Sequence, residues 1–305
     1  MKNPVADPES PKVTEFFDSK TNTFSYVVED PETARCAIID SVLDLEYASG
    51  TISHESAEEI VEFISRSKLD VEWILETHIH ADHLSAAPYL RDRLGGKIGI
   101  GERVTSVQKK FGSVFFEGSE FERNGSQFDV LLTDAQILNI GSVSGYVLHT
   151  PGHTPACVTY VFGNAVFVGD TLFMPDVGTA RADFPGGNAR DLYRSIRKIL
   201  ALPASSRVFV CHDYMPDGRE RQHETTIFEQ AHKNIHLGSE ISEDDYVEMR
   251  RARDASLSMP KLILPSIQVN MRAGHLPIRE AGCTYLKIPI NIVAHSNSEK
   301  ASESS

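Results

Sequence analysis

The chain has 305 residues, of which 41% are hydrophobic and 24% are charged, a balance typical of a globular protein with a large core. Its 30 basic and 43 acidic residues give a net charge of -13, which disfavours nucleic acid, itself a polyanion, as a partner. No apolar stretch approaches the roughly 18 residues of a membrane span, and residues 1–13 lack the apolar block of a signal peptide. The sequence therefore predicts a cytoplasmic protein that binds neither nucleic acid nor a membrane.

The predicted elements alternate between strands and helices. In the first third of the chain we expect strands at 23–29, 35–40, 71–76 and 98–100 and helices at 54–67 and 84–94. In the middle we expect strands at 128–132, 136–140, 144–149, 157–162 and 165–168. After these come a helix at 189–200, a strand at 207–211, helices at 220–236 and 243–252, and a strand-like, proline-interrupted segment at 260–292. This order predicts a two-sheet sandwich with helices outside, in which polar residues at strand ends share a rim.

The domain organisation follows from what separates the elements. We find no internal repeat, no long low-complexity linker and no sharp change of composition. The sequence therefore predicts one domain over 14–292, whose C-terminal extension begins near residue 243. A flexible arm at 1–13 and a Ser/Glu/Lys-rich flexible tail at 293–305 are expected on either side.

The four cysteines and the twelve histidines are distributed differently. Cys36, Cys157, Cys211 and Cys283 lie far apart without C-x-x-C spacing, so they indicate neither a disulfide framework nor a thiolate metal site. We expect each cysteine to be a small buried hydrophobic residue. The histidines are unevenly spread along the chain, and their densest group comes directly after a predicted strand.

Four potential metal ligands fall within six positions of that group: His78, His80, Asp82 and His83. Alternation in an extended segment sends His78 and His80 to one side, and the following turn can bring the other two to a neighbouring position. Imidazole and carboxylate ligands suit Zn²⁺ or Fe²⁺. The competing interpretation is a helix N-terminus capped by Asp82, but it leaves three closely spaced histidines unexplained.

Three further candidate ligands occur in the same local setting. His153, Asp170 and His212 each come after an apolar strand, and each would be a weak signal alone. Together with the first group they place ligand-type residues at four strand ends. The sequence therefore predicts a metal site at one rim of the sandwich.

In this order, the spacing His78-x-His80-x-Asp82-His83 followed by His153, Asp170 and His212 resembles the full ligand set of the metallo-β-lactamase superfamily. The resemblance implies a four-layer αββα sandwich with its metal site at the rim between two mixed sheets. It covers roughly residues 14–214, and the motif is specific for the fold but permissive about the reaction.

Finer features resemble two sister branches of that superfamily, glyoxalase II and the persulfide dioxygenases. Residues 169–173 (GDTLF) and 211–214 (CHDY) are similar to both. The segments that favour the persulfide dioxygenases are 16–18, 23–26, 38–40, 180–184 (ARADF, similar to Gly-Arg-Thr-Asp-Phe) and 269–274 (VNMRAG, similar to Asn-Met-Arg-Cys-Gly). With these segments the resemblance extends from about Phe16 to Asn291.

The resemblance implies one ferrous ion held by His78, His153 and Asp170. Such a triad leaves about three octahedral positions open for a sulfur anion and O₂. The implied reaction converts glutathione persulfide, O₂ and water to sulfite and glutathione, in sulfide detoxification. The remaining candidates would then orient the ligands, hold waters and tune the iron: His80, Asp82, His83 and His212.

Two other interpretations stay open. Nothing in the sequence removes the ligands of a second metal, and two zinc ions bridged by Asp170 would generate a hydroxide for thioester hydrolysis, as in glyoxalase II. The distinguishing feature is the tail, because glyoxalase II has a helical C-terminal domain with lysines for glutathione, whereas 260–292 reads as strand-like. The last interpretation is a metal-binding regulatory or structural protein without turnover.

The expected partners are glutathione persulfide or another small persulfide, and O₂. Glutathione carries two carboxylates, and these suit arginine side chains, which bind carboxylates in a bidentate manner. The candidate substrate contacts are Arg181, Tyr214, Arg219 and Arg272, and the competing interpretation of each arginine is a structural ion pair. Tail strands that pair between subunits would make the protein a homodimer or homotetramer.

Overall fold

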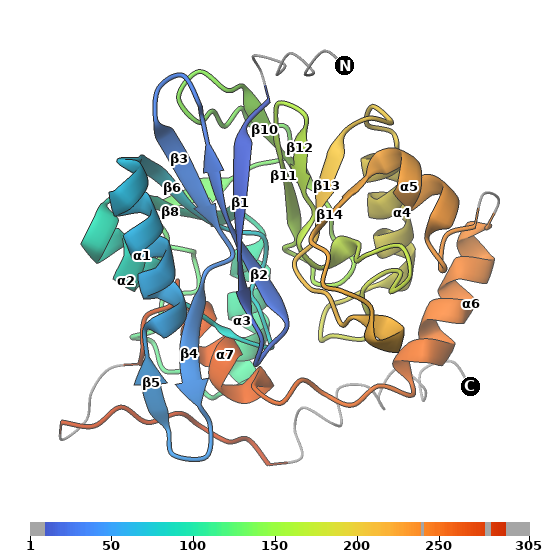
Figure 1. Ribbon diagram of the computed structural model, residues 1–305. Helices are drawn as coiled ribbons and strands as arrows, with labels where there is room; N and C mark the ends of the chain where they lie inside the picture. The colour runs from blue at the N-terminus through green and yellow to red at the C-terminus, as the bar shows by residue number, and fades with distance from the viewer. Residues whose placement is uncertain (1–9, 239–240, 278–281, 291–305) are drawn as a thin grey trace.

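The computed structural model describes residues 10–238, 241–277 and 282–290. Figure 1 shows four layers, in which a first group of helices, the two large sheets and a second group of helices follow one another from left to right. This arrangement confirms the αββα sandwich and its two mixed sheets. In the described part of the chain, no helix is both long and apolar enough to cross a bilayer.

The first sheet has six strands in the order β1-β2-β3-β6-β8-β9. Their bounds are β1 Lys12–Asp18, β2 Thr23–Glu29, β3 Arg35–Ile39, β6 Asp70–Glu76, β8 Lys97–Gly101 and β9 Val130–Leu132. β1 to β3 pair antiparallel, and β3, β6, β8 and β9 pair parallel. A small sheet is formed by β5 (Thr51–Ser53), β4 (Val42–Glu46) and β7 (Leu84–Ser85). The helices of this half are α1 (Glu55–Ser67), α2 (Ala87–Leu94) and α3 (Val104–Val114).

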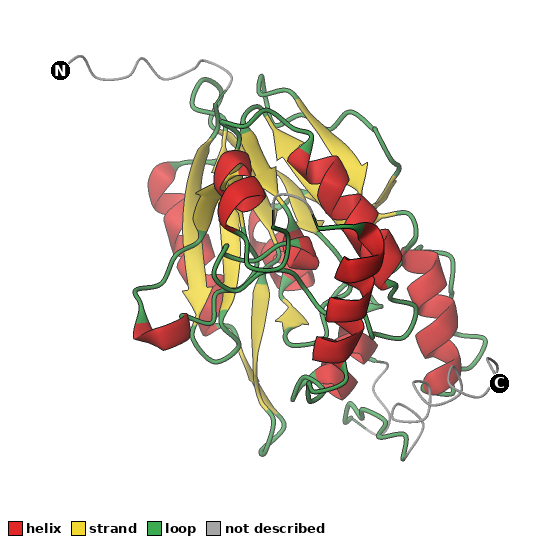
Figure 2. Cartoon of the chain, turned by 90° about the vertical axis from the view of Figure 1, so that its right-hand side faces the viewer, coloured by secondary structure: helices red, strands yellow, loops and turns green. Residues whose placement is uncertain are grey.

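The second sheet has five strands in the order β10-β11-β12-β13-β14. Their bounds are β10 Gly145–His149, β11 Val158–Phe162, β12 Ala165–Phe167, β13 Arg207–Phe209 and β14 Glu224–Thr226. The later helices are α4 (Ala189–Leu200), α5 (Ile227–Lys233), α6 (Glu243–Asp254) and α7 (Ile263–Asn270), with 3-10 turns at η1 (Gly169–Thr171) and η2 (Pro216–Gly218). Figure 2 views the molecule from the side on which helices cover the second sheet.

Three hydrophobic cores separate the four layers, and strand alternation assigns the side chains to them. Val27 of β2 packs under the first helices, whereas its neighbours Tyr26 and Val28 face the space between the sheets. In β13, Phe209 faces the other sheet and Val208 faces α4. Because both faces of these strands are buried, they read in the sequence as continuous apolar runs.

Two predicted elements of the second half are wrong in type. Residues 220–236 do not form one helix, because residues 224–226 pair antiparallel with β13, and the Thr226 hydroxyl then caps the shorter α5 by accepting from Glu229 N. Residues 136–140 form no continuous strand. The chain turns back at Gly141, where φ is +54°, and the pairing is limited to isolated bridges.

The tail also differs from its predicted strand-like character. Residues 263–270 form helix α7, in which seven of the eight residues are buried. A helix that is buried on nearly all sides has no amphipathic period, so periodicity does not reveal it. The same tail exposes Cys283, contrary to the expectation for every cysteine, while Cys36, Cys157 and Cys211 are buried as expected.

The structure also bears on the two predicted ends of the domain. β1 begins at Lys12, inside the predicted arm, because Lys12 and Val13 already pair with β2. The rest of that arm up to residue 9, and the predicted tail at 293–305, lie outside the described residues. Strands β4 and β5 and helix α3 were not among the sequence predictions.

The strand ends define the place of the site. β6, β10, β12 and β13 all lead to the same rim of the sandwich, and the ligand-type residues follow them within seven positions. After α6 the chain crosses beneath both sheets to reach α7, as Figure 1 shows at the lower edge of the molecule. The tail therefore closes the rim where the loops after these strands meet.

Candidate metal centre

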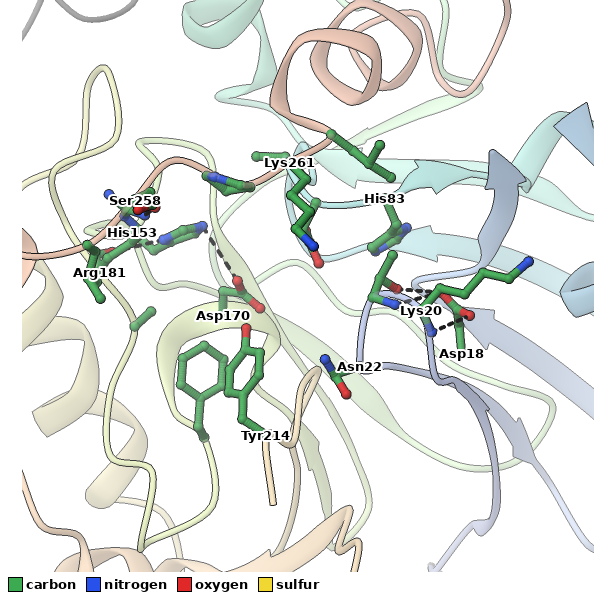
Figure 3. A pocket seen from close by; sticks show the side chains of 18 of the residues that line it. Asp18, Lys20, Asn22, His83, His153, Asp170, Arg181, Tyr214, Ser258 and Lys261 are labelled. Carbon is green, nitrogen blue, oxygen red and sulfur yellow. Dashed lines mark hydrogen bonds and ion pairs between the residues drawn. The ribbon is translucent and has the colours of Figure 1, made fainter. Parts of the chain in front are cut away.

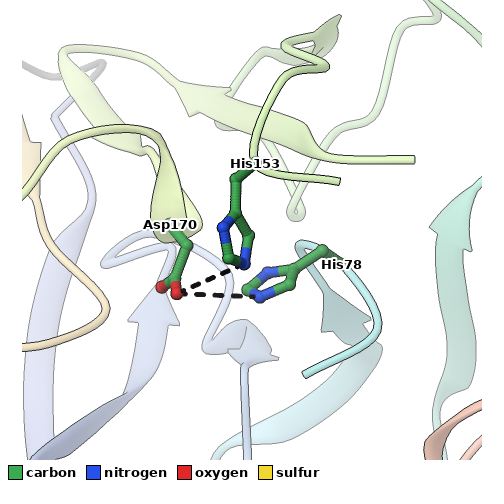
Figure 4. A group of neighbouring side chains, drawn as sticks. All are labelled: His78, His153 and Asp170. Atoms are coloured by element: carbon green, nitrogen blue, oxygen red, sulfur yellow. Dashed lines mark ion pairs between the residues drawn. The ribbon is translucent and has the colours of Figure 1, made fainter. Parts of the chain in front are cut away.

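Three side chains from three different loops point toward one another at the rim, as Figure 4 shows. The Nε2 atoms of His78 and His153 lie 4.0 and 3.7 Å from the same oxygen, Oδ2 of Asp170. All three residues are buried. Because two metal–ligand bonds of about 2.1 Å span at most about 4.2 Å between ligand atoms, these three groups can reach one common ion.

The second oxygen of Asp170 faces the other way. Its Oδ1 lies 3.2 Å from His212 Nε2, and His212 Nε2 lies 3.3 Å from Asp82 Oδ2. His83 belongs to a neighbouring group of mutually close ligand atoms that includes Asp82 and His80. Asp170 therefore stands between two groups of possible ligands, with one oxygen turned toward each.

Many atoms of this cluster are buried without a hydrogen-bond partner in the described structure. They are His78 Nε2, His80 Nδ1, Asp82 Oδ2, His83 Nε2, Asp170 Oδ1 and His212 Nε2. Buried polar atoms of folded proteins are normally paired, because an unpaired one costs about 1–3 kcal/mol. A concentration of them on imidazole and carboxylate groups is what a metal ion requires, so the residues fit a bound metal.

The other ring nitrogen of each inward-facing histidine is held by an oxygen. His153 Nδ1 lies 2.9 Å from the Arg181 carbonyl, and His83 Nδ1 lies 3.1 Å from the Leu84 carbonyl. A carbonyl only accepts, so Nδ1 carries the proton and Nε2 keeps its lone pair for a metal. His78 Nδ1 is similarly placed, 3.0 Å from the Thr77 hydroxyl.

His80 has a different environment from the other candidates. Its Nε2 lies 2.9 Å from Asp40 Oδ1 and 3.1 Å from Glu76 Oε2, and all three side chains are buried. Asp40 also accepts hydrogen bonds from the Thr77 amide and hydroxyl. Although burial alone would lower the pKa of His80, the charge and hydrogen bond of Asp40 and then Glu76 raise it well above its usual value. His80 thus links the histidine loop to the scaffold beneath it.

The charges of the cluster shift several pKa values in the metal-free protein. Burial alone would raise the pKa of Asp170, but His212, and then His78 and His153, lower it well below its ordinary range. Burial would lower the pKa of His212, and the carboxylates of Asp170 and Asp82 instead raise it to about 9. Protonated His212 therefore supplies, without metal, part of the positive charge that these carboxylates need.

A cavity of about 770 Å³ opens onto the cluster, and Figure 3 shows side chains on its walls. His83, His153 and Asp170 face it from the metal side, while Lys261 reaches into it from the segment between α6 and α7. Neither Lys261 nor the neighbouring Arg253 forms an ion pair within the described residues. The cavity therefore combines a metal-binding floor with cationic groups on one wall.

Two of the predicted substrate contacts line this cavity, Arg181 and Tyr214. The guanidinium of Arg181 is already engaged, because it binds both carboxylate oxygens of Asp183 and the carbonyl of Ser258. Tyr214 stacks on His212 and is half exposed. Desolvation, and then the charges of Asp170 and Asp82, raise the pKa of Tyr214. Its hydroxyl therefore stays protonated and can act as a hydrogen-bond donor.

The other two predicted contacts do not line the cavity. Arg219 binds Asp176 and Asp213, with its Nη1 2.6 Å from Asp213 Oδ2. Arg272 pairs with the buried Glu117 at 2.9 Å and lies over the Phe121 ring. The structure therefore pairs both arginines with acidic residues and places neither on the cavity wall, and their role in substrate binding stays a prediction.

Asn270 and Lys261 were not among the predicted site residues. Asn270 Nδ2 donates to the carbonyls of His80 and His83 at 2.9 and 2.8 Å, and its Oδ1 accepts from the Ser85 amide. The segment that contains Asn270 was singled out in the sequence, but nothing there indicated that it contacts the histidine loop. Lys261 sits beside Pro260 in a segment that carried no signal of its own.

Comparison with known proteins agrees with this geometry. The family model "Metallo-beta-lactamase superfamily" matches residues 19–212. A probable metallo-hydrolase of Burkholderia pseudomallei is 53% identical over 91% of this chain and 98% of its own, and glyoxylase B2 of Dictyostelium discoideum is 48% identical over 92% and 97%. The human mitochondrial persulfide dioxygenase ETHE1 is 27% identical over 85% and 87%.

Among solved structures, the crystal structure of ETHE1 from Myxococcus xanthus aligns with a TM-score of 0.69 and 27% identity, covering 87% of this chain and all of that one. The distant similarity to ETHE1 in sequence and in structure supports the persulfide dioxygenase branch that the sequence motifs resemble. Together with the match to the family model and the ligand residues assembled at one rim, these relatives show that the chain belongs to the metallo-β-lactamase superfamily.

Proposed function

We propose that the chain is an iron-dependent persulfide dioxygenase that converts glutathione persulfide, dioxygen and water to sulfite and glutathione. In this reaction the outer sulfur is oxidised by four electrons, which dioxygen takes up, and the S–S bond breaks. Water supplies the third oxygen of sulfite, glutathione leaves as the thiol, and two protons are released for each neutral persulfide consumed.

The observation that carries this proposal is the contact between Asn270 and the histidine loop. Asn270 lies in the Asn-Met-Arg segment that resembles the persulfide dioxygenases, and it holds the carbonyls of His80 and His83. In glyoxalase II, the other branch that the motifs resemble, the C-terminal end of the chain forms a helical domain whose lysines bind glutathione. The contact of this motif residue with the metal loop supports the dioxygenase, whereas the helical tail and Lys261 at the cavity fit a thioester hydrolase as well.

His78, His153 and Asp170 would hold the iron, with both Nε2 atoms turned toward Asp170 Oδ2. Ferrous iron supplies the redox chemistry that triplet dioxygen needs to react with a closed-shell persulfide, chemistry that zinc lacks. The carbonyl of Arg181 keeps the His153 ring oriented, and the protonated hydroxyl of Tyr214 offers a hydrogen bond at the cavity wall. These residues thus fix the ligands and leave the cavity side free for substrate.

The cations that remain unpaired in the cavity suit the carboxylates of glutathione. Arg253, in the last turn of α6, and Lys261, in the segment after it, both line the cavity, and each could bind one carboxylate. This replaces the arginines expected from the sequence with a different pair of cations. The cavity is also lined by Lys20, Asp18 and Asp44, and the two acidic groups suit the ammonium of the glutamyl end.

The decisive experiment counts metals and measures oxygen consumption with the full chain purified without air. After loading with Fe²⁺, we expect on the order of one iron per chain, and oxygen uptake with sulfite production when glutathione persulfide is added. S-lactoylglutathione should not be hydrolysed at a comparable rate. A tightly bound zinc pair, with thioester hydrolysis and no oxygen uptake, would overturn the proposal.

A binuclear thioester hydrolase is the second candidate, and the two-sided placement of Asp170 favours it. Oδ1 of Asp170 faces His212, which also lies near Asp82, so a second ion has possible ligands. Asp82→Asn separates the two candidates. It should lower turnover of a two-metal hydrolase by at least about 100-fold, but that of the one-iron dioxygenase by less than about 10-fold.

A further inference from the structure

Helix α6 lies outside the metal cluster, but its side chains form hydrogen bonds to the loop that orients a candidate metal ligand. We propose that the buried Arg250–Asp254 pair of α6 is a positioning device for His153. The inference rests on the proposed role of His153 as a metal ligand, which both candidate functions share.

Two side chains of α6 form a buried ion pair. Arg250 and Asp254 lie one helical turn apart, with side chains only 2% and 5% exposed. Arg250 Nε and Nη2 lie 2.8 and 2.7 Å from Asp254 Oδ1. A surface ion pair would contribute little, but this one is withdrawn from water and has a fixed geometry.

The remaining donor and acceptor atoms of this pair bind the backbone of a neighbouring loop. Arg250 Nη1 donates to the Thr179 carbonyl at 2.9 Å, and Asp254 Oδ2 accepts from the Ala182 amide at 2.9 Å. The two ends of the four-residue stretch 179–182 are thus fixed to the same two side chains. Tyr246, also on α6, adds a contact to the Thr179 hydroxyl at 2.8 Å.

The stretch 179–182 also contacts a candidate metal ligand. The Arg181 carbonyl, between the two fixed ends, lies 2.9 Å from His153 Nδ1. At its other end the same loop returns to Asp170, because Leu172 bridges to Thr179 across it. A displacement of 179–182 would therefore rotate the His153 ring away from Asp170.

Partners that orient a ligating histidine typically change metal affinity by 10- to 100-fold when they are lost. In this chain the partner of His153 is a backbone carbonyl, which no substitution of Arg181 removes. The position of that carbonyl depends instead on Arg250 and Asp254. These two residues therefore control the ligand without contacting it.

The test uses Co²⁺ binding to the metal-free full chain, followed by visible absorption, which reports both affinity and ligand geometry. Asp254→Asn keeps the shape of the side chain but places an amide donor against Ala182 N or Arg250. We expect at least 10-fold weaker Co²⁺ binding and an altered cobalt spectrum. In Arg250→Lys the ammonium cannot bind Asp254 and the Thr179 carbonyl at once, so this variant should give the same change. It takes the place of Asp254→Asn if that variant does not fold.

The matched control is Ser242→Ala, which removes the cap of the same helix at Asp245 and touches neither the loop nor the cavity lining. It should lower the melting temperature and leave the cobalt spectrum and affinity unchanged. If Asp254→Asn and Arg250→Lys behave like Ser242→Ala, the positioning role is wrong. That outcome is independent of the oxygen-uptake experiment, because Co²⁺ binding does not depend on which reaction the centre performs.

Discussion

Two buried polar clusters lie on either side of residues 179–182, and they differ in one respect. In the metal cluster, His78 Nε2, His80 Nδ1 and His83 Nε2 have no hydrogen-bond partner among the described residues. In the α6 cluster, Arg250 and Asp254 bind each other and two backbone groups. The metal cluster thus contains buried polar atoms without hydrogen-bond partners, whereas the polar atoms of the Arg250–Asp254 pair are all bonded.

This difference separates groups that await a ligand from groups that hold the fold. An unpaired buried polar atom costs stability, so the metal cluster weakens the metal-free chain. A buried ion pair with all its hydrogen bonds made loses much more when one partner is removed. Substitutions in the two clusters should therefore affect function and stability in opposite proportions.

The largest expected effect is on function, from His78→Gln in the metal cluster. This change removes one of the three groups that converge on a common ion, so we expect metal retention and turnover to be abolished. The unfolding free energy of the metal-free chain should stay within about 1 kcal/mol of the parent value, because the lost Nε2 had no partner to lose. Urea unfolding without metal checks this, and a drop of several kcal/mol would erase the distinction between the clusters.

The largest expected effect on stability comes from Asp254→Ala in the α6 cluster. The substitution leaves the Arg250 charge buried and without its carboxylate, at a cost of about 3–5 kcal/mol. The measurement is again urea unfolding of the metal-free chain, so the two variants can be compared directly. If Asp254→Ala were no less stable than His78→Gln, the α6 cluster would not be holding the fold.

The metal cluster could be predicted from the sequence, and the α6 cluster could not. His78, His80, Asp82 and His83 are dense in the sequence, and each of the other ligands follows an apolar strand. In an α/β sandwich, strand ends meet at a rim, so local patterns fix where these side chains gather. The layered fold followed from the same alternation of elements.

Arg250 and Asp254 look like any charged pair at i, i+4 on a helix, a pattern that is usually solvated. Only the tertiary fold shows that the Arg250 donor and the Asp254 acceptor bind a loop about 70 residues away. The same reason explains why the ion pairs of Arg219 and Arg272 were not predicted. Asp176 and Glu117 lie far from these arginines in the sequence, and although Asp213 is only six residues from Arg219, no local pattern indicates that the two pair.

A smaller effect is expected from pH, through His236, a histidine beside the α6 cluster. His236 Nδ1 accepts a hydrogen bond from the Thr179 amide, and burial, followed by the charges of Arg250 and Arg253, lowers its pKa to about 4. Between pH 6.5 and 4 the unfolded chain therefore binds more protons at this site than the folded chain. Stability should fall as the pH falls through that window, by at most about 3 kcal/mol from this residue.

The variant His236→Asn isolates this contribution, because an amide oxygen can replace Nδ1 as the acceptor but does not titrate. Compared with the parent, its unfolding free energy should depend less steeply on pH between 4 and 6.5. Urea unfolding at several pH values in metal-free buffer measures both slopes. Equal slopes would mean that His236 is not held neutral by the α6 cluster.

The smallest effect concerns Lys261, whose charge is not paired with a residue of either cluster. It reaches into the cavity and has no ion-pair partner among the described residues, so a substrate carboxylate is the group that would complete it. Such a contact is made equally in the bound substrate and in the transition state, and its loss raises KM without changing kcat. For Lys261→Ala we expect KM for glutathione persulfide to rise about 10-fold, which corresponds to about 1.4 kcal/mol.

Lys287→Ala is the matched control, because Lys287 pairs with Glu117 at 3.3 Å away from the cavity, and its KM should stay at the parent value. A fall in kcat with unchanged KM in Lys261→Ala would instead place this lysine near the reacting atoms, and the unpaired charge would then serve the chemistry rather than substrate binding.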